Sequence, residues 1–164
     1  MLNQVDRLQN YPYYFQYTLN PYGEDIENNL PPVEQRMDTF KRLADKIGKE
    51  KVVWRYDPIL TNAIYNVEFH KEAFAQIADG LKDHTERCML GFIDHYPHIR
   101  SAVSQHGIDP LQKAEIEEMA VSFKNTISQY PQIELDTCTN KVNLNHLGIP
   151  NGLCVDKKLI EKII

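Results

Sequence analysis

The sequence predicts an α/β fold with about four strands alternating with helices, arranged as a partial (β/α) barrel or a small open parallel sheet. Two observations support this prediction. Short runs of aromatic and β-branched residues are each followed by a longer segment whose apolar residues recur at steps of three and four. One of these runs, residues 88–93, is apolar throughout, which is typical of a strand covered on both faces. Such alternation implies right-handed crossovers between parallel strands.

The first strand and helix are predicted near the N-terminus. Residues 13–19 have the aromatic and β-branched composition of a strand, and Asn-Pro-Tyr-Gly at 20–23 ends it. From Pro32 the apolar residues follow helical spacing as far as Ile47, and Gly48 suits the C-terminal cap. We therefore expect a helix over 32–47.

The same alternation continues to the C-terminus. A second strand is expected at 52–56, stopped by Asp57-Pro58, and Asn66 is a suitable cap for the helix that follows. Two helical pieces follow the third strand, with a break near 107–110. The remaining expected elements are a helix over 66–81, a strand at 88–93, a helix over 111–128, a strand at 132–135 and a last helix from 157.

Both ends of the chain have the pattern of interrupted helices. Leu2, Val5 and Leu8 fit the tail of a helix that leads into the first strand, and Ile163-Ile164 lies on an apolar helical face without a capping residue. We therefore expect residues 1–164 to form a single α/β domain that is a fragment of a longer barrel-like protein.

Composition excludes several classes of protein. The 18 basic and 23 acidic residues leave a net charge of −5, which argues against nucleic-acid and anionic-membrane surfaces. No apolar run approaches the roughly 20 residues that span a bilayer, and no secretory signal is evident. Three cysteines without a Cys-x-x-Cys spacing favour the reducing cytoplasm. Open sheet edges would also permit self-association.

Polar residues follow each predicted strand, where the ligand sites of parallel α/β proteins gather. We expect a small-molecule site there. Arg55 stands out because a strand arginine covered by helices needs a carboxylate or an anionic ligand, and Asp57 or Asp94 could supply the carboxylate. A purely structural ion pair is the alternative. The predicted substrate-binding residues are Asn20, Tyr22, Arg55, Asp57 and Asp94.

The segment Asp94-His95-Tyr96-Pro97-His98 is the best local candidate for a metal site. Imidazole and carboxylate groups suit zinc, iron or manganese, so His95, His98 and Asp136 are candidate ligands. The simpler alternative is that Asp94 or His95 caps a helix that begins at Pro97. The other histidines of the central region are expected in solvated positions: His70, His84 and His106.

The cysteines separate into one core candidate and two candidate thiol groups. Cys88 begins an apolar strand and fits a small buried hydrophobe. Cys138 follows the fourth strand, and Cys154 would approach it if the intervening loop folds back; core packing is the alternative for each. Glycine-rich phosphate loops, a Gly-x-Ser-x-Gly elbow and a Cys-x-x-x-Cys-x-x-Cys motif are absent from the sequence.

Four segments carry a resemblance to a bacterial family called domain of unknown function 1848. They are residues 13–23, 53–59, 92–94 and 152–156. Arg55, Asp57, Asp94, Cys138 and Cys154 match the strand-end motifs of that family. Thr139-Asn140 departs from the Ala-Glu that the family's pattern has after the first of these cysteines.

The resemblance implies that full members are longer at both ends. They begin with a Ser-Arg-Arg-Thr-Asp-like segment and end with a cysteine-rich stretch similar to the cluster motif of radical S-adenosylmethionine enzymes. An iron–sulfur cluster and S-adenosylmethionine are therefore implied for the full-length protein, and neither is predicted in this chain.

Three functional hypotheses remain at this stage. The first is the central part of an iron–sulfur enzyme of the radical S-adenosylmethionine type, inactive alone. The second is a metal-dependent hydrolase or lyase that uses strand-end Asp and His residues. The third is a non-catalytic binding or assembly module whose sheet edges a partner covers.

Overall fold

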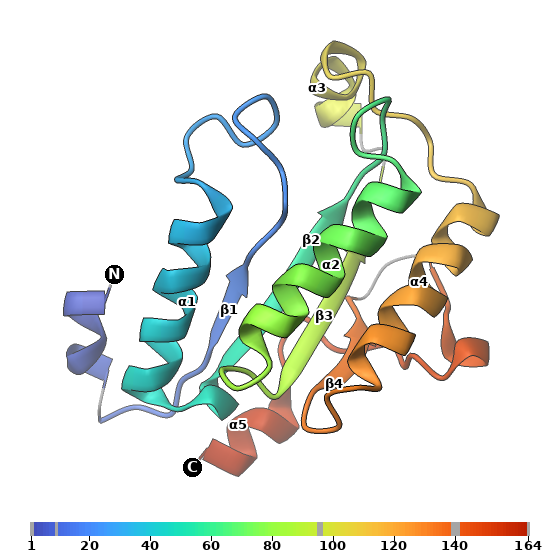
Figure 1. Cartoon of the computed structure of the whole chain (residues 1–164). Helices are drawn as coiled ribbons and strands as arrows, with labels where there is room; N and C mark the ends of the chain where they lie inside the picture. The colour runs from blue at the N-terminus through green and yellow to red at the C-terminus, as the bar shows by residue number, and fades with distance from the viewer. Residues whose placement is uncertain (1, 9, 95–96, 139–141, 164) are drawn as a thin grey trace.

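A computed structural model describes residues 2–8, 10–94, 97–138 and 142–163. Its centre is one sheet of four parallel strands in the order β1-β2-β3-β4 (Figure 1). The strands are β1 (Phe15–Thr18), β2 (Val52–Ile59), β3 (Arg87–Phe92) and β4 (Glu134–Thr137). The predicted α/β class is confirmed. The sheet is open, with β1 and β4 at its edges, rather than closed into a barrel.

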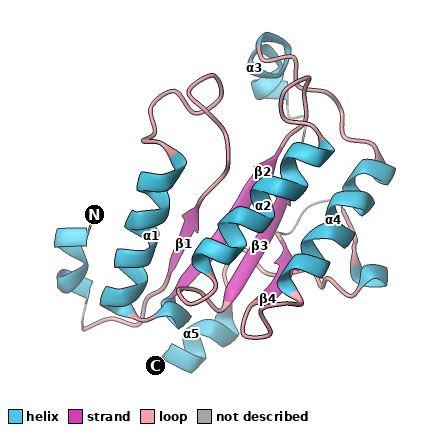
Figure 2. Ribbon diagram, in the orientation of Figure 1, coloured by secondary structure: helices cyan, strands magenta, loops and turns pink. Residues whose placement is uncertain are grey.

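Three long helices cover one face of the sheet (Figure 2). They are α1 (Val33–Ile47), α2 (Val67–Leu81) and α4 (Lys113–Ile127). The side chain of Asn66 caps α2 by accepting a hydrogen bond from the backbone N–H of Phe69, as the sequence predicts. None of the described helices is both long enough and apolar enough to cross a membrane.

Short elements occupy the connections and the two ends. The first is a 3₁₀ helix near the N-terminus, where the sequence predicts helical spacing. In chain order they are η1 (Leu2–Leu8), η2 (Lys49–Lys51), η3 (Pro97–Ile99), α3 (Arg100–Gln105), η4 (Asn145–Leu147) and α5 (Lys157–Ile163).

Stacked aromatic rings fill the space between the sheet and α2 and α4. The rings of Phe74 and Phe123 stack with centroids 4.2 Å apart, and Trp54 stacks on Phe74 at 4.9 Å. The indole N–H of Trp54 donates to the carbonyl of Leu19, so this buried polar group is satisfied. Cys88 is fully buried in the same core, as predicted.

The opposite face of the sheet is crossed by the chain between β4 and α5. Asn151 forms a bridge with Thr137 of β4, and the backbone carbonyl of Cys154 accepts a hydrogen bond from Gln16 of β1, 2.6 Å away. The backbone N–H of Asp156 then donates to the Tyr14 hydroxyl at 3.0 Å. This crossing segment, residues 151–156, brings residues of the C-terminal region against the N-terminal strand.

The strand boundaries differ from the predicted ones, most clearly in β2 and β4. The predicted stop at Asp57-Pro58 is wrong: β2 continues to Ile59, which pairs with Phe92 after a shift in register. The strand continues because the buried side chain of Asn20 forms hydrogen bonds with both the backbone N–H and the backbone carbonyl of Asp57. The fourth strand lies two residues later than predicted, at Glu134–Thr137.

The prediction that His70 is solvated is wrong. It lies on the buried face of α2 and has no exposed surface. Its Nε2 lies 2.8 Å from the carbonyl oxygen of Leu60, and its Nδ1 lies 2.8 Å from the Tyr56 hydroxyl. Because a carbonyl only accepts, Nε2 carries the proton, and Nδ1 accepts from Tyr56. His84 and His106 are partly exposed.

Candidate functional site

Arg55 is the centre of a polar cluster towards the carboxyl ends of the strands. The cluster lies on the face of the sheet opposite α1, α2 and α4, which is called the open face below. Its guanidinium forms an ion pair with Asp57 of the same strand. It also donates to the Gln16 side chain of β1 at 2.9 Å and lies 3.5 Å from the Cys138 sulfur, just beyond β4. The name Arg55 cluster is used below for Gln16, Arg55, Asp57, Cys138 and Cys154.

The alternation of strand side chains places these groups on one face. Trp54 and Tyr56 point into the helix-covered core, so Arg55 and Asp57 point to the opposite face. Their side chains are each 23% exposed, which leaves the ion pair accessible to a ligand. The predicted partnership of Arg55 with a strand-end carboxylate is confirmed, with Asp57 as the partner.

A glycine on the neighbouring strand makes room for the Asp57 carboxylate. A Cβ at Gly91 would lie 2.3 Å from the Asp57 carboxyl carbon, which is far inside van der Waals contact. The backbone of β3 therefore approaches the carboxylate closely because residue 91 has no side chain. Asp57 is fixed from one side by Arg55 and from the other by this backbone.

Cys138 and Cys154 form a thiol pair next to Arg55. Their sulfur atoms lie 3.5 Å apart, which is the approach that the sequence allows if the chain between them folds back. Burial raises the pKa of the Cys138 thiol, and its hydrogen bond with Cys154 raises it further, whereas Arg55 acts in the opposite direction. No disulfide joins the two sulfur atoms, and Cys154 is solvent-exposed.

Two of the predicted binding residues have their polar atoms occupied by backbone groups. Asn20 is buried; its side chain accepts from the backbone N–H of Asp57 at 2.9 Å and donates to the Asp57 carbonyl at 3.0 Å. The Tyr22 hydroxyl donates to the carbonyl of Pro58 and accepts from the N–H of Leu60. These two residues support the end of β2, and the geometry gives them a positioning role.

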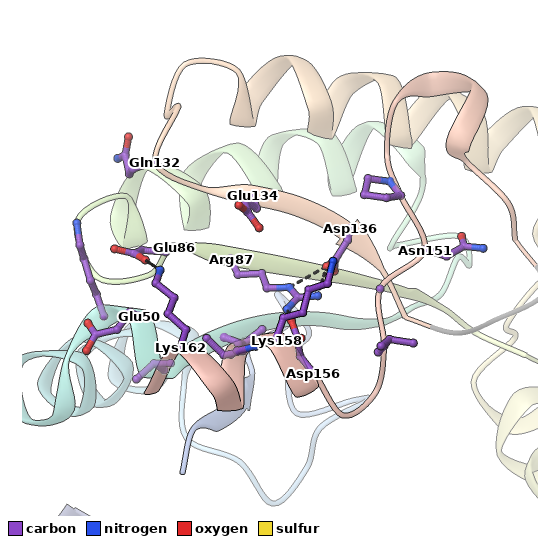
Figure 3. Close-up of a pocket in the computed structure, with 17 residues that line it drawn as sticks. Glu50, Glu86, Arg87, Gln132, Glu134, Asp136, Asn151, Asp156, Lys158 and Lys162 are labelled. Atoms are coloured by element: carbon purple, nitrogen blue, oxygen red, sulfur yellow. Dashed lines mark hydrogen bonds and ion pairs between the residues drawn. The ribbon is translucent and has the colours of Figure 1, made fainter. Parts of the chain in front are cut away.

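A second ion cluster lies on the open face, nearer the amino ends of the strands. Arg87, at the start of β3, donates to both Asp136 of β4 and Asp156 of the crossing segment (Figure 3). The Arg87 Nε and the Asp136 Oδ2 are 2.7 Å apart. Burial raises the pKa of Asp136, and Arg87 opposes this shift.

Of the three candidate metal ligands, Asp136 alone has a side chain that the structure describes, so the metal site stays a prediction. Asp136 pairs with Arg87 in the second cluster, whereas Asp94 lies half-buried two residues after β3. His95 lies outside the described residues, and for His98 only the backbone is described. Among the described residues, no three His, Cys, Asp or Glu side chains form a group that could hold a metal ion.

Three residues of these clusters were missed by the sequence analysis. Gln16 interrupts the aromatic pattern of its strand, and Arg87 directly precedes the apolar run 88–93. Extending the period-two alternation of each strand to these positions would have placed both on the face of Arg55. Asp156 carries no such signal, because its position depends on a crossing segment that has no regular structure. Thr139 and Asn140, where the resemblance departs from its pattern, lie outside the described residues.

Comparison with known proteins identifies a family but no characterised relative. No curated protein and no solved structure matches the chain. The family model described as "Domain of unknown function (DUF1848)" matches residues 1–164, which is the whole chain. The resemblance that the strand-end motifs carry is thus confirmed, and the chain belongs to the DUF1848 family.

Proposed function

We propose that the Arg55 cluster is the substrate-binding site of a small-molecule enzyme and that Arg55 binds an anionic group of the substrate. One observation carries the proposal: a partly exposed guanidinium is held in place by side chains from β1, from β2 and from the end of β4. A guanidinium fixed in this way offers a planar, oriented set of donors, which suits carboxylate and phosphate groups.

The location of the cluster supports a binding role over a purely structural one. Ligands of open α/β sheets bind at the carboxyl ends of the strands. The cluster lies towards these ends, because Arg55 pairs with Thr18, the last residue of β1, and Cys138 directly follows β4. An ion pair whose side chains are each only 23% exposed is partly desolvated, and this desolvation cost offsets much of the attraction between the two charges. Stability alone therefore gives little reason to assemble polar side chains from so many elements around one guanidinium.

The cysteines of this chain do not fit an iron–sulfur cluster by themselves. Such clusters are held by three or four cysteine thiolates, as a rule. Cys88 is fully buried on the helix-covered side of the sheet, so only Cys138 and Cys154 lie together. In this proposal, the iron–sulfur cluster and S-adenosylmethionine implied by the resemblance belong to the full-length protein outside this chain, and the chain alone binds substrate without turnover.

The proposal is tested by calorimetric titration of the purified chain with succinate, inorganic phosphate and adenosine monophosphate. We expect at least one of these probes to bind, and R55K to weaken its binding by about tenfold or more because the planar fork is lost. The matched control is R42K, which changes an arginine whose side chain is 64% exposed on α1.

Two results would contradict the proposal. One is that none of the three probes binds the wild-type chain. The other is that R55K binds the probe as tightly as R42K does. Circular dichroism of both variants separates a loss of binding from a loss of structure.

A further inference from the structure

A separate cavity of about 510 Å³ lies on the open face of the sheet, towards the amino ends of the strands (Figure 3). Its walls come from the starts of β2 and β3, from β4, from the crossing segment and from α5. Among the described residues that line it, none belongs to the Arg55 cluster. Its volume is in the range of cavities that hold small-molecule ligands.

Asp136 lines the cavity and has a buried carboxylate oxygen that lacks a partner among the described residues. Asp136 is only 6% exposed, and its Oδ2 receives the hydrogen bonds from Arg87. Its Oδ1 is buried and has no hydrogen-bond partner among the described residues. A buried carboxylate oxygen without a donor is costly, so this atom is suited to a donor that a ligand brings.

The charges around Asp136 are not balanced. Asp136 and Asp156 share the single guanidinium of Arg87, which leaves one negative charge in the group. Asp156 has additional support from the backbone N–H of Leu159, whose distance to Oδ1 is 3.1 Å. Asp136 has no comparable second donor among the described residues, because both of its hydrogen bonds from Arg87 end at Oδ2, so a cationic donor suits its Oδ1.

A lysine on α5 adds a group of the opposite charge to the same cavity. Lys158 is exposed and lines the cavity, and its side chain extends over the ion cluster in Figure 3. The cavity thus combines a buried anionic acceptor with an exposed cationic side chain, which together complement a molecule carrying both charges.

We propose that this cavity binds a small zwitterion of the amino-acid class, with its ammonium group donating to Asp136 Oδ1 and its carboxylate facing Lys158. The site is independent of the Arg55 cluster, because neither its charges nor its lining residues are shared. If no zwitterion binds in the cavity, the proposed function of the Arg55 cluster still stands. If no anion binds at Arg55, the proposal for the cavity still stands.

The test titrates the purified chain with glycine and 4-aminobutyrate as zwitterions, and with butylamine and butyrate as singly charged comparisons. We expect at least one zwitterion to bind about tenfold more tightly than butyrate, because only the ammonium satisfies Asp136. K158M should lower the affinity for 4-aminobutyrate to that for butylamine. K157M is the matched control, since Lys157 lies on the same helix but does not line the cavity.

Two further variants locate the site. D136N should weaken binding of both ammonium compounds by about tenfold or more, whereas D83N, at an exposed carboxylate elsewhere, should not. Since D136N could disturb the ion cluster, L159W provides a second measurement: it fills the cavity and leaves Asp136 and Arg87 in place. Unchanged binding in L159W, or butyrate binding as tightly as 4-aminobutyrate, would overturn the proposal.

Discussion

Lowering the pH from 7 to 5 should destabilise this fold through a single buried histidine. In the folded protein His70 is neutral, with Nε2 donating to the Leu60 carbonyl and Nδ1 accepting from the Tyr56 hydroxyl. A proton added at Nδ1 would face that hydroxyl, and the charge would lie in a site with no access to water. Burial accordingly lowers the pKa of His70 to about 4.

The sign and size of the effect follow from linkage. In the unfolded chain the pKa of His70 returns to 6.5, so between pH 6.5 and 4 the unfolded state binds more protons than the folded state. The stabilisation is present above pH 6.5 and is lost as the pH falls. The loss is about 2 kcal/mol at pH 5 and approaches about 3 kcal/mol below pH 4.

The assay is urea unfolding at pH 7 and pH 5, in the wild type and in His70→Gln. Glutamine can donate to Leu60 and accept from Tyr56 but cannot become charged in this range. We expect the pH-dependent loss of unfolding free energy to be about 2 kcal/mol smaller in the variant. His106→Gln, at a partly exposed histidine, is the control. Equal pH dependence in wild type and His70→Gln would refute the reasoning.

Three further substitutions test the packing around the site and the core, each by urea unfolding at pH 7. Asn20→Ala leaves the partly buried backbone of Asp57 without its side-chain partner and should cost about 1–3 kcal/mol; an unchanged midpoint would contradict this role. Gly91→Ala places a methyl group against the Asp57 carboxylate, so we expect about 1–3 kcal/mol of destabilisation together with weaker probe binding at Arg55. Phe123→Ala removes the ring stacked on Phe74 and should cost about 3–5 kcal/mol, and a cost below about 1 kcal/mol would show that the stack is not central to the core.

The alternation of strands and helices could be predicted because each element carries its own periodic signal. Residues 88–93 are apolar at every position, and β3 is buried on both sides accordingly. The predicted stop at Asp57-Pro58 is wrong because proline ends a strand only where a neighbouring strand needs a hydrogen bond from the N–H that proline lacks. Here Asn20 supplies the hydrogen bonds that keep the end of β2 in place.

The Arg55 cluster was predictable in part for the same reason. A polar residue within an apolar strand must find a partner, and that rule led to Asp57 or Asp94 as candidate partners of Arg55, of which the structure has Asp57. Alternation also identifies Gln16 and Arg87 once the open face is recognised as a polar surface. A single sequence does not show which face of the sheet the helices cover, because both faces contain apolar side chains.

Contacts that depend on the crossing segment could not be predicted from local patterns. The approach of Cys154 to Cys138 and of Asp156 to Arg87 depends on how an irregular stretch returns across the sheet. His70 was misplaced for a related reason: its spacing puts it on the apolar face of α2, but a polar side chain there is buried only because Tyr56 and Leu60 satisfy it.

The most direct test of the proposed binding site is nuclear magnetic resonance of the arginine side chains during titration with succinate and inorganic phosphate. If Arg55 binds the anionic group of a substrate, its guanidinium signal should shift in a saturable manner with at least one of these probes, whereas the exposed Arg42 should show no saturable change. An Arg55 signal that stays in place with both probes, or that shifts no more than that of Arg42, would contradict the account.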